Sequence, residues 1–328
     1  MRAPSFWNQP DTTLLAAALS PFGWLYGALT AHRMAKSGLS LTVPVLCIGN
    51  FTAGGAGKTP VAACLAQALA ARGERPAIVS RGYGGALSGA QPVRVDAALH
   101  TSADVGDEPL LLARIAPTYI CVDRVAGARA ALAAGATVIL LDDGLQNPRL
   151  TKSCAIAVVD SEVGVGNGLC LPAGPLRVPL AVQWPHVQAV ISMGAGAADA
   201  PVLAEAARRK VRVFKARLVP DPVISAAIAG QRVFAFAGIG RPEKFFATVR
   251  QTGADLAATQ AFPDHHRFTK ADLTSLARLA QQRGIIPVTT EKDAMRLPPE
   301  MRVHVVALPV TLEIEDKDAL LDMIASRF

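Results

Sequence analysis

The sequence predicts an α/β protein in which a doubly wound, mostly parallel sheet of the P-loop NTPase type is followed by a second, smaller α/β domain. Short apolar runs alternate with helix-like segments, which is the pattern of a parallel sheet covered by helices. A glycine-rich turn joins the first of these runs to the first helix. The alternation pauses near Lys215–Gly230, where Pro220-Asp221-Pro222 suits a hinge, and then starts again.

These observations divide the 328 residues into three expected parts. Residues 1–36 form an N-terminal membrane-associated helical segment. Residues 37–218 form the P-loop core domain, and residues 219–328 form the smaller C-terminal α/β domain after the hinge.

The N-terminal segment carries no charged residue from Thr12 to Ala31, and Arg33 and Lys36 follow closely. The run is long enough to span a bilayer, but Pro21 and Gly23 interrupt it. We expect one or two helices on the membrane surface, with Trp24 and Tyr26 at the interface and the basic residues at the headgroups. An ordinary core helix and a true transmembrane span remain the alternatives.

The composition favours an anionic partner, because the net charge is +7. Aromatic residues make up only 5% of the chain and no basic run contains interleaved aromatics, so we expect no nucleic-acid partner. The five cysteines are scattered and form no C-x-x-C pair. This distribution fits a reducing cytosol and argues against a structural zinc site.

The first strand–helix junction contains a candidate phosphate-binding loop. An apolar run at Val45–Ile48 suits a buried strand, and residues 61–69 have helical spacing. Between them lie the candidate nucleotide-binding residues Thr52, Ala53, Gly54, Gly55, Ala56, Gly57, Lys58 and Thr59. Glycines allow backbone N–H groups to curl around phosphates, Lys58 would reach the β- and γ-phosphates, and Thr59 would hold Mg²⁺.

This loop departs from the usual P-loop pattern at one position, because Thr52 stands where the first glycine is expected. The alternative to a nucleotide site is a glycine-rich turn that binds nothing. Such a turn would not explain a Lys-Thr pair at the mouth of a helix.

A later apolar run, residues 137–141, is expected to form a strand, and two carboxylates, Asp142 and Asp143, follow it. About 80 residues after a P-loop, this pattern predicts the Walker B strand, whose carboxylate approaches the Mg²⁺ of the nucleotide. The sequence leaves open which of the two residues meets the metal. Asp107 and Glu108 precede another helix, where they either favour its N-terminus or serve as metal or base carboxylates.

The motifs together resemble those of one family, the tetraacyldisaccharide 4′-kinases, which act in lipid A biosynthesis in Gram-negative bacteria. The matching stretches follow the family order from residue 43 onward, and Thr52 in the glycine loop is also similar to the family. At one position the chain departs from it: after DDGLQ the family usually has His, and this chain has Asn147. The stretches are GGAGKTP, SRGYGG, GDEPLLLA, DDGLQ, LPAGPLR, AGIGRPEKFF, FPDHHRF and TTEKDAMRL.

The resemblance implies that ATP and Mg²⁺ are the cofactors. It implies transfer of the γ-phosphoryl group to the 4′-hydroxyl of a tetraacylated glucosamine disaccharide 1-phosphate, giving lipid IVA. It also implies a peripheral or N-terminally anchored position on the cytoplasmic side of the bacterial inner membrane. We predict no obligate protein partner.

The acceptor and the catalytic base are assigned on this basis. Loops after strands of one sheet open at the same crevice, so we expect the acceptor to contact Arg81, Tyr83, Gln146, Asn147 and Arg177.

With Asp142 and Asp143 assigned to the metal, Asp107 is the best remaining acid to accept the hydroxyl proton. The resemblance points to an Asp–His dyad, in which His265 is our choice and His266 stands behind it. The alternative is that Asp107 only caps its helix and that His265 is a surface residue.

The sequence fits three other classes of protein less well. A partition-type ATPase carries an extra Lys before the glycine pair, and this chain has Ala53 there. A GTPase needs an Asn-Lys-x-Asp motif, which Glu291-Lys292-Asp293 does not match. A non-enzymatic membrane module would leave Lys58 and Asp142 without a purpose.

Overall fold

The structure, a computed structural model, describes residues 4–9 and 12–328, so residues 1–3 and 10–11 of the predicted N-terminal segment lie outside the described part. The chain forms two compact units. The smaller unit contains Leu218–Thr311 with residues 101–103, and the larger contains the other described residues up to Arg217 together with Leu312–Phe328.

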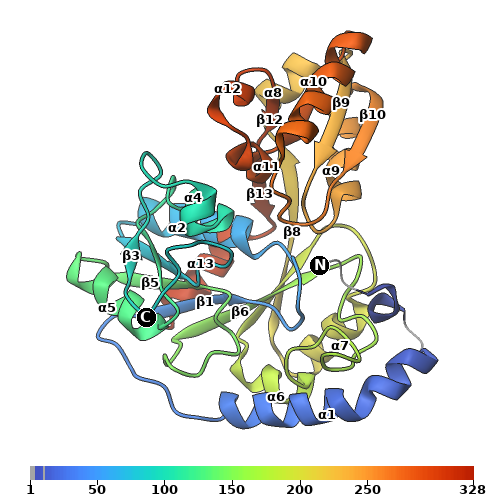
Figure 1. Cartoon of the computed structure of the whole chain (residues 1–328). Helices are drawn as coiled ribbons and strands as arrows, with labels where there is room; N and C mark the ends of the chain where they lie inside the picture. The colour runs from blue at the N-terminus through green and yellow to red at the C-terminus, as the bar shows by residue number, and fades with distance from the viewer. Residues whose placement is uncertain (1–3, 10–11) are drawn as a thin grey trace. The chain divides into compact units, whose positions relative to one another are not determined.

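The larger unit is built on a nine-stranded sheet in the order β13-β8-β7-β6-β1-β5-β2-β4-β3 (Figure 1). All pairs from β4 through β8 are parallel, and β3 runs antiparallel to β4. The carboxyl ends of the parallel strands therefore meet at one edge. The strands are β1 (Val45–Gly49), β2 (Pro76–Ser80), β3 (Val93–Arg94), β4 (Thr118–Ile120), β5 (Val138–Asp142), β6 (Cys154–Asp160), β7 (Ala189–Met193), β8 (Arg212–Pro220) and β13 (Val310–Ile314).

Helices cover both faces of this sheet because its central strands are apolar on both sides. Leu46 and Ile48 of β1 pack in one core with α2 (Lys58–Ala71), α4 (Asp107–Leu112) and α13 (Lys317–Ala325). Val45 and Cys47, which point the other way, pack in a second core with α5 (Arg124–Ala133), α7 (Ala200–Arg208) and Trp184. Trp184 opens the 3-10 helix η2 (Trp184–His186), directly after α6 (Leu180–Gln183); the remaining short helices are η1 (Ser5–Asn8) and α3 (Ser102–Val105).

The C-terminal boundary differs from the expected one. The sequence placed all of 219–328 in the smaller domain, whereas residues 312–328 belong to the larger unit. The reason is apolar burial: Leu320, Leu321 and Ile324 of α13 lie in the core beside α2. A last strand and helix with this alternation can pair with either sheet, so the sequence pattern did not reveal which one they join.

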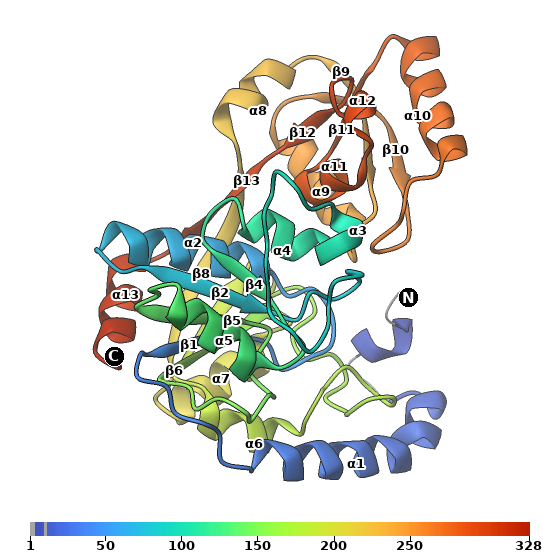
Figure 2. The ribbon, with the colours of Figure 1, turned by 60° about the vertical axis from the view of Figure 1, so that its left-hand side comes forward.

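The N-terminal segment contains one long helix, α1 (Leu14–Met34), which continues through Pro21. Figures 1 and 2 both show it lying along the larger unit beside α6. It docks through small residues: a Cβ at Gly23 would stand 2.7 Å from the Cys170 carbonyl oxygen, and one at Gly27 would stand 3.1 Å from the Cys170 Sγ. By length and composition, α1 qualifies as a membrane-spanning helix, and only 17% of its most apolar window is buried.

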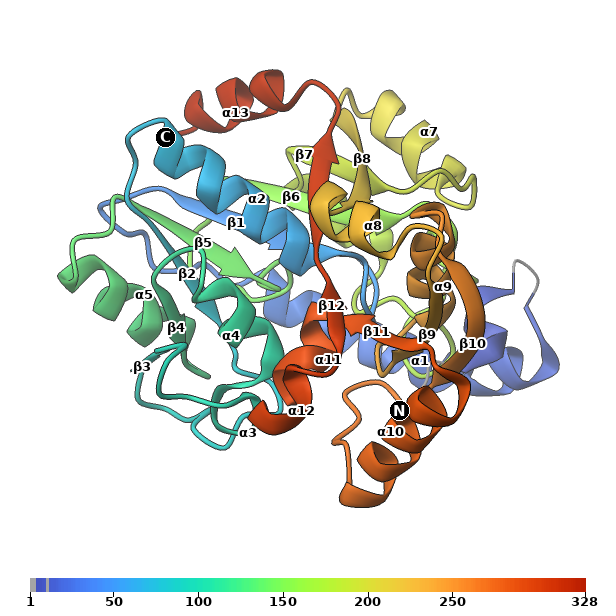
Figure 3. The same cartoon turned by 90° about the horizontal axis from the view of Figure 1, so that it is seen from above.

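The smaller unit has its own parallel sheet in the order β10-β9-β11-β12 (Figure 3). One face packs on α8 and α9, and the other packs on α10 with Phe262 and Leu297. The elements are α8 (Pro222–Ile228), β9 (Arg232–Ala237), α9 (Pro242–Gln251), β10 (Asp255–Ala261), α10 (Lys270–Arg283), β11 (Ile286–Thr290), α11 (Glu291–Arg296), α12 (Pro299–Arg302) and β12 (Val306–Leu308).

Candidate active site

The loops that follow β1, β2 and β5 meet at the carboxyl edge of the large sheet. Register pairs Ile48 of β1 with Asp142 of β5, so the P-loop and the Asp142-Asp143 turn begin at the same height. They also pack tightly, because a Cβ at Gly49 would stand only 2.5 Å from the Cβ of Leu145. The glycine at the end of β1 is therefore required by this close approach.

The P-loop opens as the glycine pattern predicts. Gly54 and Gly57 have φ angles of 118° and 90°, in the region that L side chains rarely adopt. Gly57 caps α2, so Lys58 is the first residue of that helix. The Lys58 ammonium donates to the Gly54 carbonyl oxygen at 3.3 Å and lies 3.7 Å from Asp143 Oδ1. Lys58 is thus held at the mouth of the loop, where a phosphate would meet it.

The departure at Thr52 has a structural reason. Thr52 forms an antiparallel bridge with Leu176, and the Ala53 N–H donates to the Pro175 carbonyl oxygen at 2.7 Å. An extended bridging residue needs no glycine, because any L residue adopts that backbone conformation. The LPAGPLR stretch therefore fixes the start of the P-loop.

Asp143 is held between two cations. Arg177 forms a two-pronged pair with it, with nitrogen–oxygen distances of 2.8 and 2.9 Å, and Lys58 stands nearby. Burial alone would raise the pKa of Asp143, but the charges of Lys58 and Arg177 lower it below its usual value. Asp143 is therefore ionised and already paired.

Asp142 lies in the opposite environment. It is buried, and its Oδ2 accepts a hydrogen bond from the Ser80 hydroxyl at 3.1 Å. Its Oδ1 has no hydrogen-bond partner among the described residues. Burial, followed by the negative charges of Glu108 and Asp143, raises the pKa of Asp142 to about 7. A divalent cation would satisfy the Oδ1 atom and remove this penalty, so Asp142 rather than Asp143 suits the metal.

The negative charge of Glu108 also raises the pKa of Asp142. From the sequence, Glu108 could be either a helix N-terminal residue or a metal or base carboxylate. Among the described residues, no cluster of three or more His, Cys, Asp or Glu side chains could hold a metal. Mg²⁺ in phosphoryl-transfer sites commonly takes one or two carboxylates, with substrate phosphates and water as its other ligands. Asp142, Thr59 and Glu108 match that limited protein contribution.

Gln146 is engaged in bracing the P-loop. Its amide nitrogen donates to the Asn50 carbonyl oxygen at 2.6 Å and to Gln183 Oε1 at 2.8 Å. Gln183 in turn donates to the Phe51 carbonyl oxygen at 3.2 Å. The sequence missed Gln183, because a single glutamine in an apolar stretch carries no signal of this contact.

Asn147 closes a local turn, with its side-chain oxygen accepting from the Arg149 N–H at 2.9 Å.

Arg81 and Tyr83 follow β2 and are exposed, as a substrate-contacting pair would be. Their loop packs against the Asp107 turn, since a Cβ at Gly106 would stand 2.8 Å from the Tyr83 carbonyl oxygen. Asp107 is buried at the first turn of α4. The structure thus brings the Asp107 turn into contact with the loop that carries Arg81 and Tyr83.

The sequence also missed Arg124, the first residue of α5. It is buried, donates to the Cys121 carbonyl oxygen at 2.8 Å, and has an Nε atom without a partner among the described residues. Burial lowers its pKa, and the charges of Asp143 and Asp142 oppose this shift. No motif surrounds Arg124, so only the sheet geometry could place it beside the two carboxylates.

His265 and His266 differ sharply within the smaller unit. His266 lies against Phe262, with ring centroids 4.7 Å apart, and its Nε2 is 3.0 Å from Asp272 in the capping box of α10. His265 has a φ of 56°, and its Nδ1 is 3.3 Å from Arg296. Arg296 is itself fixed by the buried Asp293 at 2.8 Å. His266 therefore packs against the apolar core of the smaller unit. His265 lies in a turn with a positive φ angle, and its ring contacts Arg296.

A glycine loop at a helix N-terminus binds phosphates, and a buried carboxylate beside it can bind the metal ion that accompanies them. This combination is typical of enzymes that transfer phosphoryl groups. The fold and the site of the larger unit therefore define a phosphotransferase of the P-loop class.

Comparison with known proteins identifies the family. The model of the family "Tetraacyldisaccharide-1-P 4'-kinase" matches residues 15–328. The tetraacyldisaccharide 4′-kinase of Methylobacterium nodulans is 56% identical over 321 residues, or 98% of this chain and 94% of the relative. That of Methylorubrum extorquens is 54% identical over 328 residues, or 100% of this chain and 99% of the relative. The chain belongs to the tetraacyldisaccharide 4′-kinase family, and it is a kinase.

A solved structure supports the fold. It is described as the "apo" form of LpxK from Aquifex aeolicus in complex with ATP. It matches with a TM-score of 0.73 and 24% identity over 96% of this chain and 100% of that chain. These findings confirm both the resemblance drawn from the motifs and the predicted fold class.

Proposed function

We propose that this kinase transfers the γ-phosphoryl group of ATP to the 4′-hydroxyl of a tetraacylated glucosamine disaccharide 1-phosphate, giving lipid IVA in lipid A biosynthesis. One observation carries the proposal: the glycine loop and Asp142 lie at the same edge of the sheet. Asp142 is buried, and its Oδ1 atom has no hydrogen-bond partner among the described residues. Family membership supplies the acceptor class.

Residues of the larger unit position the phosphates of ATP and stabilise the charge that develops during transfer. The backbone N–H groups of the loop and Lys58 bind the phosphates, and Lys58 stabilises the negative charge that develops during transfer. Thr59, Asp142 and Glu108 would hold Mg²⁺, which would neutralise the phosphate oxygens when bound.

Arg177 and Asp143 form the acceptor side of this arrangement. Their pair is partly exposed, so a sugar phosphate reaching the crevice can exchange contacts with the guanidinium. Arg81 and Tyr83 offer a further cation and a flat face from the neighbouring loop. Gln146 and Asn147 contribute through loop position, because their side chains hold the backbone around the site.

The proton of the attacking hydroxyl goes to Asp107, assisted by His265. Asp107 is buried at the first turn of α4, next to the loop that carries Tyr83. His265 is held by the Arg296–Asp293 pair rather than by core packing, which makes it the better candidate of the two histidines. Kinetics of the single and double variants test whether the two residues act together.

The kinase works at the cytoplasmic face of the inner membrane, with α1 in the interface. Its acceptor carries four acyl chains and stays in the bilayer, so the enzyme has to reach it there. Large apolar side chains on α1 are exposed, among them Phe22 at 64%, Trp24 at 76% and Leu29 at 57%. Exposed apolar residues in such numbers on one helix indicate a membrane or protein contact.

The decisive experiment for the activity is incubation of the full chain with ATP, Mg²⁺ and the acylated disaccharide 1-phosphate. Mass analysis should show one added phosphate at the 4′ position. ATP hydrolysis that does not depend on the acceptor, with no phosphorylated lipid, would contradict the proposal.

For the membrane contact, we expect the double substitution Trp24→Ser with Leu25→Ser to weaken binding to vesicles about tenfold or more, because two exposed apolar side chains are lost. Co-sedimentation with phosphatidylcholine vesicles measures the effect. The double substitution Val213→Ser with Leu218→Ser, at two exposed positions on β8, is the matched control and should leave binding unchanged. Equal losses in both variants would contradict the assignment of α1.

A further inference from the structure

A second basic site lies at the opposite, amino-terminal edge of the large sheet. A pocket of about 410 Å³ opens at the C-terminal end of α1. Lys36, Lys152 and His186 contribute its basic groups, and Ser37 and Thr151 contribute hydroxyl groups. No acidic side chain and no Phe, Tyr or Trp occurs among the described residues that line it.

The pocket is a built feature rather than a chance gap between loops. Leu39 and Leu150 form a parallel bridge, and the Leu39 N–H donates to the Arg149 carbonyl oxygen at 2.9 Å. Gly38 fits this junction because a Cβ there would stand 2.4 Å from the Pro148 carbonyl oxygen. The paired segments hold the chain next to Lys36 and Lys152 in fixed register.

Within the described part of the chain, no carboxylate pairs with the cations of this pocket. Lys152 is half-buried, and its ammonium donates to the Asn147 carbonyl oxygen at 2.6 Å. Burial lowers the pKa of Lys152. Burial and then the charge of Lys152 lower the pKa of His186. An anion placed between these groups would stabilise their charged forms and accept several hydrogen bonds.

The pocket lies away from the P-loop, at the amino ends of two strands. Lys152 stands two residues before β6, and Gln188 directly precedes β7. The connection that begins with Asp143 at the carboxyl edge reaches this pocket at Lys152, whose ammonium donates to the Asn147 carbonyl oxygen. The seven residues of β6 extend over roughly 23 Å between the two edges. The nucleotide phosphates bound at the P-loop are therefore not the occupant of this pocket.

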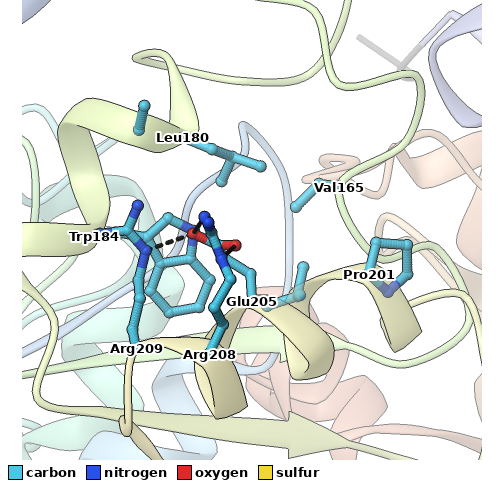
Figure 4. Close-up of a pocket in the computed structure, with 9 residues that line it drawn as sticks. Val165, Leu180, Trp184, Pro201, Glu205, Arg208 and Arg209 are labelled. Atoms are coloured by element: carbon cyan, nitrogen blue, oxygen red, sulfur yellow. Dashed lines mark hydrogen bonds and ion pairs between the residues drawn. The ribbon is translucent and has the colours of Figure 1, made fainter.

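The neighbouring pocket between α6 and α7, shown in Figure 4, provides an internal contrast. Its arginines, Arg208 and Arg209, both pair with Glu205, and Arg209 also lies over the Trp184 ring. The charge of that pocket is already compensated by protein groups. The pocket at the end of α1 has hydroxyl groups and cations, and its described lining residues include no such acid.

We propose that the pocket at the end of α1, lined by Lys36, Lys152 and His186, binds the phosphate of an anionic phospholipid headgroup. Its place favours a lipid over a soluble anion, because it continues from the helix whose apolar side chains are exposed. The absence of a lining aromatic ring argues against a nucleotide, whose base would need stacking. The inference rests on the proposed membrane contact of α1.

The test compares vesicles that carry equal surface charge from different anions. One set contains phosphatidylglycerol and the other contains oleate, each in phosphatidylcholine and matched in zeta potential. The full-length protein should bind the phosphatidylglycerol vesicles about tenfold more tightly, because only they present a phosphate in a negatively charged headgroup. Binding to neutral vesicles reports the contact of α1 separately, so failure of the membrane proposal is distinguishable from failure of the pocket.

The double substitution Lys36→Gln with Lys152→Gln should reduce this preference to within about twofold. Arg33→Gln, which removes an exposed cation near the end of the same helix but outside the lining residues, should weaken binding to both charged vesicles while keeping the preference. Lys36→Gln with His186→Gln provides a second variant that leaves the Lys152 hydrogen bond intact. Thermal melts establish that each variant is folded.

Three results would overturn the proposal. The first is equal binding of the wild-type protein to the two charged vesicles. The second is a preference that survives in both folded double variants. The third is displacement from phosphatidylglycerol vesicles by inorganic phosphate below about 1 mM, which would assign the pocket to a soluble anion instead.

Discussion

The two edges of the large sheet handle positive charge in opposite ways. At the carboxyl edge, Lys58 and Arg177 already face Asp143, at 3.7 and 2.8 Å. At the amino edge, Lys36 and Lys152 line a pocket without an acid among its described lining residues. At a site with internal ion pairs, an anionic ligand can replace the carboxylate as the partner of a cation and be released again during a reaction cycle. A site with uncompensated cations suits a ligand that stays bound and supplies the missing charge.

The largest expected effect concerns Lys58, which marks the catalytic edge. Lys58→Met should lower kcat by about a thousandfold or more, because the charge that develops on the transferred group loses its main protein cation. Steady-state kinetics with the lipid acceptor measures this. The same variant should keep its preference for phosphatidylglycerol vesicles; loss of that preference would mean that the two edges are not independent.

The proposed Asp107–His265 pair is expected to produce the next largest effect. Asp107→Asn and His265→Ala should each lower kcat by about a hundredfold or more with little change in the KM for ATP. The double variant should be little worse than the more damaging single variant, because residues that act as a unit do not contribute additively. Losses that multiply in the double variant would show that the two residues act separately.

Substitution of Arg177 tests whether the paired charge at the catalytic edge serves the acceptor. Arg177→Lys keeps the charge but loses the two-pronged contact with Asp143. We expect the KM for the disaccharide to rise about tenfold, while the KM for ATP changes less than threefold. Arg208→Lys, on the exposed side of α7, is the matched control. An effect confined to ATP would assign Arg177 to the nucleotide instead.

The smallest expected effect is on stability and separates Asp142 from Asp143. The folded state raises the pKa of Asp142 to about 7 from 3.8, so it binds more protons than the unfolded state between those values. Stability from this group is therefore present at low pH and is lost as pH rises towards 7. Asp142→Asn should raise the melting temperature of the ligand-free protein by a few degrees at pH 8, and by less at pH 5.

Asp143→Asn should do the reverse, because the folded state lowers the pKa of Asp143 and its ion pairs stabilise the fold at neutral pH. Calorimetry of both variants without metal or nucleotide measures the contrast. A lower melting temperature for Asp142→Asn at pH 8 would contradict the unfavourable environment assigned to Asp142.

The sequence by itself determined the α/β class, the position of the P-loop and the strand that ends in Asp142-Asp143. These features are local: glycines with positive φ, a lysine at a helix start and apolar runs of strand length constrain the backbone wherever they occur. The family motifs likewise lie in contiguous stretches, so their order could be recognised without coordinates. Even the exposed apolar character of α1 was visible as an uncharged run.

Only the tertiary structure decided the features that depend on distant residues. It showed that Asp143 is neutralised by Arg177, 34 positions away, while Asp142 keeps an oxygen without a partner among the described residues. It placed α13 on the larger unit, and it brought Lys36 and Lys152 to one pocket. Burial and charge pairing arise from the packing of segments that are far apart in the chain, and two adjacent aspartates can therefore acquire opposite electrostatic properties.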